Sequence, residues 1–593
     1  MSFHWPRGVG FWLLALVAAP CARAAITVNI AGIEGELRQN VQVFLSLERY
    51  KARNDLDETT FDSLVERAEQ EVTSALRPFG YYEPKVDVSV SKTGSSDRRV
   101  TVRVQPGKPV LMTQVTIKVT GEGAQLPAFE RITNSNQLRT GQRLSHGGYD
   151  TVKRELLRSA STLGFLEARL LKAELRVDPR NYSATADLEL DTGTRYRFGT
   201  TTISQSAIEE RLLRRYLRYR EDEPYDGTEL LRTQFALDDS QYFANVEVAT
   251  LPPDRDNHII PVSITAETNR RNRYSYGAGF GTDTGARGTA TWDKRLVNRR
   301  GHRMRVEGKA AQQNQSLEAR YLIPIGDPAV EKLTFEFGAR NEERADLDLR
   351  TLEIQPSVTH LRGRWQRVMS LSFNRTTTIT PALAPLPETR TTDTLAIPSI
   401  SYSAVPLGYL GEGLYTRGTY FELRGSSTAF GSPANYLQVR AELERVFDLA
   451  PQWHLLVRGQ LGASLIPDSQ DLPGTERFFA GGDRSVRGFG YNDLSPIVNG
   501  VKVGGKHFVS GTVEFVRDLP RNLGVAAFAD AGNAFNEFSN SVAVSVGVGF
   551  RWRLPVLTLG IDIAQAISMP QNGATTVQTL PGPRLHLNFS PKL

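Results

Sequence analysis

One glycine-rich, basic segment carries the residues best suited to specific polar chemistry. The segment spans residues 478–491, and its centre is the motif Val486, Arg487, Gly488 and Phe489. An arginine that folds into a protein interior needs buried acceptors, because an unpaired buried charge is costly. Glu514 and Asp530 follow downstream, and one guanidinium can bind two carboxylates. The spacing alone leaves two interpretations open: a buried arginine bound to these acids, or an exposed arginine on a solvated loop.

Other chemistries find little support in the sequence. Residues 500–507 nearly match a phosphate-binding loop, but His507 replaces the required Ser or Thr, and a strand pattern follows where a helix is needed. The eight histidines show no metal-ligand spacing, and neither G-x-S-x-G nor H-E-x-x-H occurs. The single cysteine, Cys21, permits no internal disulfide and no cysteine metal cage. We therefore expect no enzyme active site, no metal and no cofactor.

Length and composition narrow the class of protein. The chain has 593 residues, enough for several domains, with 40% hydrophobic and 23% charged residues, so wholesale disorder is excluded. A net charge of +6 is too small to argue for nucleic-acid binding. After the first two dozen residues no apolar run approaches 18 residues, which excludes a helical multi-pass membrane protein. A β-barrel passes this test, because its strands are short and only half apolar.

Residues 1–24 read as a secretory signal peptide. Arg7 precedes an apolar run at 9–19 that is too short to span a bilayer, and residues 22–24 form a small-x-small cleavage site. A lipoprotein interpretation of Cys21 is disfavoured by the proline directly before it. We expect an exported chain whose mature form lacks cysteine.

Residues 25–267 contain an internal repeat of about 80 residues. Each copy reads β-α-α-β-β, and an aromatic residue ends its long helix, at Tyr81, Phe165 and Tyr242. The expected boundaries are 25–106, 107–192 and 193–267. The third copy departs from the pattern, since Gln241 stands where the first two have glycine.

From residue 268 the pattern changes to alternating segments of about ten residues, separated by Gly, Pro, Asn and Asp. Apolar residues lie on one face, and Arg, Glu, Gln and Thr on the other, which is typical of a transmembrane barrel. At about 20 residues per strand and connection, 268–593 holds about 16 strands. The sequence therefore predicts three α+β repeats followed by a 16-stranded antiparallel β-barrel; single segments leave a soluble sandwich or propeller open.

Closure of such a barrel requires the last strand to pair with the first. Glycines reduce side-chain packing on the expected first strand, and apolar residues alternate on the last. We expect a weak seam formed by Gly277, Gly279, Gly281, Leu585, Leu587 and Phe589. An edge with unpaired N–H and C=O groups can template a new strand.

The V-R-G-F motif, the F-x-D-x-G strand at 528–532 and the repeats resemble the outer-membrane assembly and secretion superfamily that joins periplasmic POTRA repeats to a 16-stranded barrel. The resemblance covers residues 25–593. It implies that Arg487 lies on an inward-folded sixth extracellular loop, near 465–504, and pairs with Glu514 and Asp530 in the lumen.

Three repeats make the chain most similar to the translocation and assembly module members of this superfamily. The resemblance implies a non-enzymatic protein of the Gram-negative outer membrane, with periplasmic repeats. It implies β-barrel clients such as autotransporters, an inner-membrane partner of the TamB type, contact with outer-membrane lipid, and no nucleic acid. A general barrel insertase, for which five repeats are expected, and a two-partner-secretion pore, with two repeats and a plug helix, are the alternatives. A passive porin lacks the repeats and the arginine loop.

Overall fold

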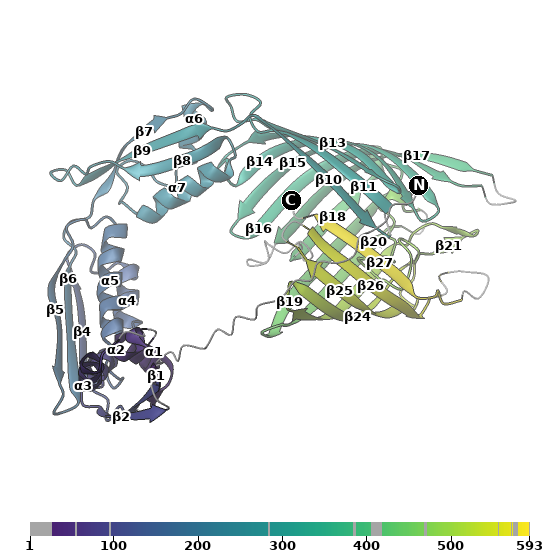
Figure 1. Ribbon diagram of the computed structural model, residues 1–593. Coiled ribbons are helices and arrows are strands. Elements are labelled where there is room, and N and C mark those ends of the chain that lie inside the picture. The colour runs from purple at the N-terminus through teal and green to yellow at the C-terminus, as the bar shows by residue number, and fades with distance from the viewer. Residues whose placement is uncertain are drawn as a thin grey trace, which may run out of the picture. The chain divides into compact units, whose positions relative to one another are not determined.

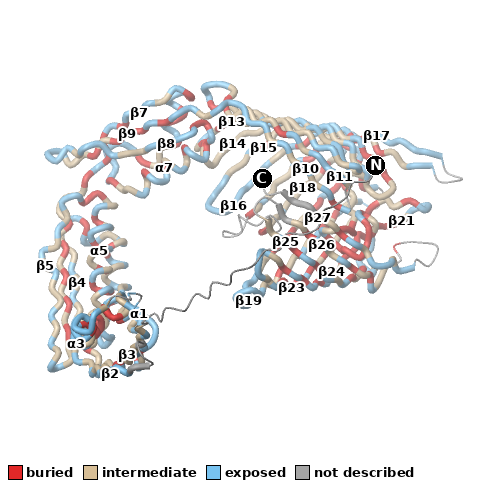
Figure 2. Tube along the Cα trace, viewed as in Figure 1, coloured by how far each residue is buried: buried red, intermediate tan, exposed pale blue. Residues whose placement is uncertain are grey.

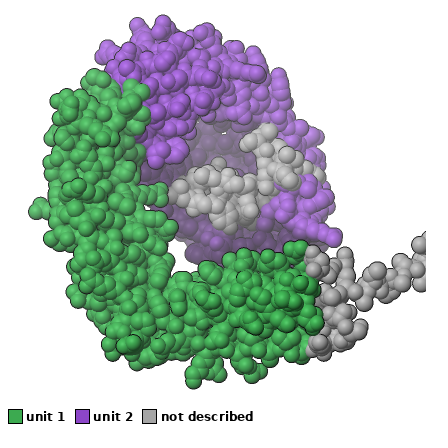
Figure 3. Space-filling model, turned by 60° about the vertical axis from the view of Figure 1, so that its left-hand side comes forward, with its two compact units in different colours: residues 1–200, 220–228, 250–261 green, residues 201–219, 229–249, 262–593 purple. Residues whose placement is uncertain are grey.

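The computed structural model describes residues 26–51, 53, 56–93, 97–282, 285–382, 387–404, 418–467, 471–554, 557–570, 572 and 579–591. The expected signal peptide, with Cys21, lies outside them. The chain forms two compact units: Met1–Thr200 with Arg220–Thr228 and Thr250–Pro261, and Thr201–Tyr219 with Glu229–Ala249 and Val262–Leu593 (Figure 3). Within the described residues, no helix has the length and apolar character needed to cross a bilayer.

The first repeat is a three-stranded sheet covered by helices. Its elements are β1 (Ile26–Ala31), α1 (Gly35–Phe44), α2 (Ser46–Tyr50), α3 (Glu58–Leu76), η1 (Arg77–Phe79), β2 (Lys85–Thr93) and β3 (Asp97–Gln105), with sheet order β1-β3-β2 (Figure 1). The side chain of Asp57 caps the N-terminus of α3. The face of α3 that carries Leu64, Ala68 and Val72 is buried. The two-helix expectation is wrong here, because Leu45 adopts an extended conformation that separates α1 from α2.

The second and third repeats have the expected β-α-α-β-β order. The second consists of β4 (Leu111–Thr120), α4 (Pro127–Asn134), α5 (His146–Thr162), β5 (Arg169–Asp178) and β6 (Ser183–Asp191). The third consists of β7 (Arg197–Ser204), α6 (Glu210–Arg214), α7 (Gly227–Asp239), β8 (Phe243–Thr250) and β9 (Ile259–Thr268). Their sheet orders are β4-β6-β5 and β7-β9-β8, so all three sheets place the last strand in the centre. The third sheet contributes residues to both units.

Sixteen antiparallel strands follow and close into a barrel, which confirms the predicted fold class. They are β10 (Asn272–Gly281), β11 (Gly285–Lys294), β12 (Arg303–Ala311), β13 (Asn314–Pro324), β14 (Glu331–Arg344), β15 (Leu347–Arg362), β16 (Trp365–Thr380), β17 (Thr389–Ala404), β18 (Thr419–Ser426), β19 (Tyr436–Ala450), β20 (Trp453–Leu465), β23 (His507–Leu519), β24 (Leu523–Phe535), β25 (Ala543–Arg553), β26 (Leu557–Ser568) and β27 (Arg584–Pro591).

Alternation along these strands separates two faces. On β23 the side chains of Thr512 and Glu514 are buried, whereas Val513 and Phe515 are exposed. Buried residues gather on β24 to β26 (Figure 2). A polar inner face and an apolar outer face are the arrangement of a barrel surrounded by lipid.

The long connection between β20 and β23, here called loop six (residues 466–506), packs against the inner wall. It contains η3 (Gly474–Glu476), β21 (Ile497–Val498) and β22 (Val501–Lys502). Four of its residues form a buried cluster with small residues of the wall: Ala480, Val486, Phe489 and Leu494 with Ala534, Ala543 and Ala566. Loop six is therefore a packed part of the barrel and brings residues 478–491 to the inner face of β24 to β26.

Candidate functional site

The backbone around Arg487 is folded into a tight, buried turn. Gly481 and Gly482 have φ values of +103° and +97°, a conformation that strains residues with a Cβ. A Cβ at Gly481 would lie 2.3 Å from the carbonyl oxygen of Gly490. The N–H of Gly482 donates to the carbonyls of Val486 (3.3 Å) and Phe489 (3.2 Å). This turn places Arg487 between Val486 and Phe489, whose side chains are buried.

The guanidinium of Arg487 binds both acidic residues that the sequence singled out. Its Nε and Nη2 donate to the two carboxylate oxygens of Asp530 (2.8 and 2.9 Å), and its Nη1 donates to Glu514 Oε2 (2.8 Å). Its Cζ lies 3.2 Å from the ring centroid of Phe528. The relative exposures of Arg487, Glu514 and Asp530 are 5%, 3% and 1%. The interaction is thus bidentate, charge-assisted and shielded from water.

A second arginine completes the cluster, and the sequence analysis missed it. Arg551 on β25 donates to Glu514 Oε1 (3.1 Å) and to both carboxylate oxygens of Asp562 on β26 (2.5 and 3.1 Å). Asp562 also lies 3.6 Å from Arg487. In the sequence, Arg551 lies between Phe550 and Trp552, which point outward. Strand alternation therefore predicts that Arg551 points inward, and this pattern could have identified it. Two cations and three carboxylates therefore share the site.

The last strand is attached to the same cluster through His586. Its Nε2 lies 2.5 Å from the carbonyl oxygen of Arg487, and its Nδ1 pairs with Asp483 of loop six. The N–H of Gly488 donates to Ser545 on β25 (3.1 Å). Loop six is thereby bonded to β23, β24, β25 and β27, and β27 forms the barrel closure with β10.

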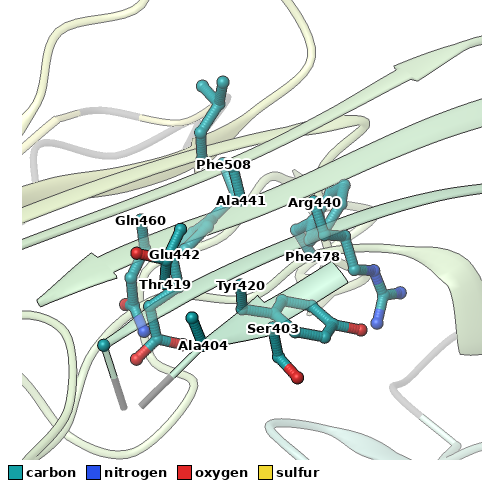
Figure 4. Close-up of a pocket in the computed structure, with 12 residues that line it drawn as sticks. Ser403, Ala404, Thr419, Tyr420, Arg440, Ala441, Glu442, Gln460, Phe478 and Phe508 are labelled. Atoms are coloured by element: carbon teal, nitrogen blue, oxygen red, sulfur yellow. The ribbon is translucent and has the colours of Figure 1, made fainter. Parts of the chain in front are cut away.

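Loop six is also attached to the opposite group of strands. Glu476 accepts an ion pair from Arg424 on β18 (2.8 Å), and its carbonyl accepts from Gln438 Nε2 on β19 (2.9 Å). A luminal cavity of about 550 Å³ lies beside this attachment, between β17–β20, Phe478 and Phe508 (Figure 4). Arg440 lines it with its Cζ 5.2 Å from the Phe478 ring centroid. Within the described residues no cluster of His, Cys, Asp or Glu is arranged to hold a metal ion.

The barrel closes through a very short ladder. Within the described residues, strands β10 and β27 share one register pair, Gly281–Asn588, and the N–H of Thr282 donates to the carbonyl of Leu587 (3.2 Å). By contrast, β26 pairs with β27 from Leu557–Pro591 to Ala564–Arg584.

The residues expected at the seam are distributed unevenly along it. Gly277 and Gly279 lie on β10 and pair with β11 only. Leu585 lies on β27 and is half exposed, and Phe589 pairs through its backbone with Leu559 on β26. Of the expected set, the structure brings Gly281 and Leu587 to the closing contact.

Residues 297–580 match the model of the Omp85 superfamily domain, and residues 27–106 match that of POTRA domain TamA domain 1. The barrel is similar to the Omp85 superfamily domain over residues 297–580. An outer membrane protein assembly factor BamA from Nitratidesulfovibrio vulgaris is 30% identical over 152 residues, 24% of this chain and 19% of that protein. The chain thus matches about a fifth of the length of this relative.

A solved structure shares the fold of this chain. BamA from Haemophilus ducreyi, in a crystal structure lacking POTRA domains 1–3, aligns with a TM-score of 0.64 at 13% identity, covering 81% of this chain and 99% of that one. At this identity the likeness shows the fold. CdiB from Acinetobacter baumannii aligns over 90% of this chain and 99% of its own, with a TM-score of 0.45 and 12% identity.

Proposed function

We propose that this protein is an outer-membrane assembly factor of the TamA type, with its repeats in the periplasm. It inserts or secretes β-barrel clients such as autotransporters, and an inner-membrane TamB-like protein is its partner. The Omp85 domain, the TamA-type match at 27–106 and three sheets ahead of the barrel support this assignment. The process needs no cofactor, because strand pairing and apolar burial in lipid supply the driving free energy.

The observation that carries the proposal is the short β10–β27 ladder. Within the described residues the two strands share one register pair, Gly281–Asn588, whereas β10 pairs with β11 from Asn272–Lys294 to Gly281–Gly285. The outer edge of β10 therefore offers N–H and C=O groups to an incoming strand. A client strand pairs there by β-augmentation and leaves sideways into the bilayer.

The arginine cluster supports this edge from inside. Loop six holds β23, β24 and β27 through Arg487 and His586, so the wall next to the seam stays in place while the β10–β27 contact opens. Arg487, Glu514 and Asp530 are accordingly positioning residues of the assembly process.

A disulfide across the seam tests the proposal. In a Cys21→Ser background, Gly281→Cys and Asn588→Cys place thiols at the single register pair. We expect locked protein to stop autotransporter assembly in cells, and reduction to restore it. A matched pair at Gly560 and Asn588, register partners on β26 and β27, locks an interface that stays closed and should leave assembly unchanged. Normal assembly by the locked Gly281–Asn588 protein would contradict lateral opening.

The BamA relative favours general barrel insertion as the second candidate function. The two candidates differ in which outer-membrane proteins depend on the chain. A TamA-type factor affects autotransporters while porins keep near-normal levels. Loss of porins together with autotransporters on depletion would favour general insertion.

A further inference from the structure

The outer face of β14 to β17 can be assigned from contacts of loop six with the inner face. Arg344 on β14 donates to the carbonyl of Thr475 in loop six (3.2 Å), so even-numbered residues of β14 point inward. Thr378 on β16 faces Gly474 of loop six, and Thr376 bonds Thr351 on β15 (3.0 Å). Because strand side chains alternate, Asn341, Arg350, Leu352 and Arg375 point outward.

On this outer face, apolar residues give way to polar ones on four neighbouring strands, with a step of two residues between β15 and β16. The register pairs Ala339 with Leu352 and Phe373 with Ala396, and it offsets these two pairs by two residues, because Leu352 opposes Arg375. The next outward positions are Asn341 on β14, Arg350 on β15, Arg375 on β16 and Thr394 on β17. A change of polarity shared by adjacent strands marks the edge of the lipid-facing band.

This edge lies at the end of the strands remote from the third repeat. The turn between β13 and β14 contacts that repeat, since Arg215 donates to the carbonyl of Gly326 (2.9 Å) and Arg218 pairs with Asp327. Arg350 and Arg375 therefore lie toward the outer leaflet in the proposed orientation.

A groove of about 570 Å³ lies beside Arg350 and Arg375. Its lining includes small side chains and four basic residues, Lys309, Arg340, Arg350 and Arg375, of which Arg350 and Arg375 belong to the outward rows. Arg350 and Arg375 are diagonal neighbours across β15 and β16, because Arg350 opposes Thr377 and Leu352 opposes Arg375. Diagonal neighbours on adjacent strands are about 7–8 Å apart. One anionic group can therefore reach both.

Both arginines are exposed, and Arg350 has one ion-pair contact. The side chain of Arg375 is exposed and makes no ion pair or hydrogen bond to any described residue. Arg350 is 62% exposed and reaches Asp348 through a single contact of 3.4 Å. Lipid-facing arginines destabilise a barrel unless they reach the headgroup level or an opposite charge.

We propose that this groove binds a phosphorylated lipid of the outer leaflet, of the lipid A class. Its phosphate accepts from Arg350 and Arg375, and its acyl chains lie over Leu317, Ala339 and Leu352. Arginine suits this ligand, because its planar fork of N–H donors matches phosphate oxygens. The inference rests on the proposed outer-membrane orientation but is independent of client assembly.

Native mass spectrometry of the full-length purified protein tests the site, with bis-phosphorylated lipid A and its dephosphorylated form as probes. We expect wild-type protein to prefer the phosphorylated form, and Arg350→Gln with Arg375→Gln to weaken that binding at least about tenfold. Arg367→Gln is the matched control: Arg367 is an exposed arginine of the same outward row of β16, eight residues away at the other end of the band. It should bind as wild type does.

Three results would overturn the proposal: equal binding of both lipid A forms, undiminished binding by the double variant, or equally tight binding of phosphatidylglycerol. A heat-modifiable shift on gels verifies that each variant has a folded barrel. Absence of the protein from isolated outer membranes would instead refute the proposed function, and this outcome is separate from the binding result.

Discussion

The side chain of Arg487 is held in place by buried hydrogen bonds. Three side-chain hydrogen bonds tie it to two carboxylates, and Glu514 is shared with Arg551. Buried pairs of this kind are poor sources of net stability, yet breaking one leaves an uncompensated buried charge. The main effect of the cluster is therefore to fix the position of loop six. Its net contribution to the free energy of unfolding is small.

We predict that Arg487→Ala destabilises the barrel by about 3–5 kcal/mol and lowers client assembly, while export and the repeats stay intact. Arg484→Ala in the same loop is the control, because that side chain is 59% exposed and lies 3.8 Å from Glu442, so a change below about 1 kcal/mol is expected. Unfolding temperature on heat-modifiable gels and autotransporter surface display are the measurements. Unchanged stability with normal display in Arg487→Ala would contradict the assigned role.

At the scale of elements, the first two repeats meet through a polar contact. Tyr82, just after the first long helix, lies with its hydroxyl 2.8 Å from Nε2 of His146 at the start of α5. Burial lowers the pKa of His146 below its usual value, with Asp150 opposing the shift, and burial raises the pKa of Tyr82. The contact thus favours a neutral histidine.

This contact predicts a pH dependence. Below the ordinary histidine pKa of about 6.5, the unfolded chain binds a proton at His146 more readily than the folded chain does. The contribution of this histidine to the free energy of unfolding is therefore fully present above that pH. It is lost as the pH falls through the lowered pKa of the folded state. We expect the protection factors of the α5 amides, which correct exchange for its intrinsic pH dependence, to fall as the pH is lowered from about 7 to about 5. His146→Gln should remove most of this change, and a pH profile identical to wild type in that variant would show that other groups cause it.

At the scale of the whole molecule, two segments of the third repeat, Thr201–Tyr219 and Glu229–Ala249, lie in one compact unit with the barrel. Arg218 forms a two-pronged pair with Asp327, and the hydroxyl of Tyr242 donates to the carbonyl of Gly301 (2.6 Å). Gln241 adopts a φ of +62°, and its side chain accepts from Arg303 (2.6 Å). The departure of the third copy from glycine is thereby explained: the glutamine keeps the left-handed turn and adds a bond to the barrel.

We predict that Arg218→Asp or Asp327→Arg alone loosens this junction, while the double exchange restores most of it. A partly exposed pair of this type contributes about 1 kcal/mol, so protease cleavage between β9 and β10 should rise several-fold in each single variant. Arg232→Asp serves as control, since Arg232 pairs only locally with Glu229 of the same helix. Additive single effects without rescue would show that the pair is not coupled.

The sequence alone determined the architecture, because both halves rest on periodicity. Helical spacing at Leu64, Ala68 and Val72 and alternation beyond residue 268 need no long-range information. It also singled out Arg487, Glu514 and Asp530, since a charged residue in a glycine-rich loop needs buried acceptors. The additional break at Leu45 was missed, because nothing in the local pattern separates α1 from α2.

Only the tertiary structure decided how distant strands meet. The roles of Arg551, Asp562 and His586 depend on four strands curving around loop six, and no spacing encodes that convergence. The closing register at Gly281–Asn588, and the outward row that brings Arg350 beside Arg375, depend equally on strand stagger. Alternation fixes the face on which a side chain lies, whereas the stagger fixed by barrel closure decides which side chains become neighbours.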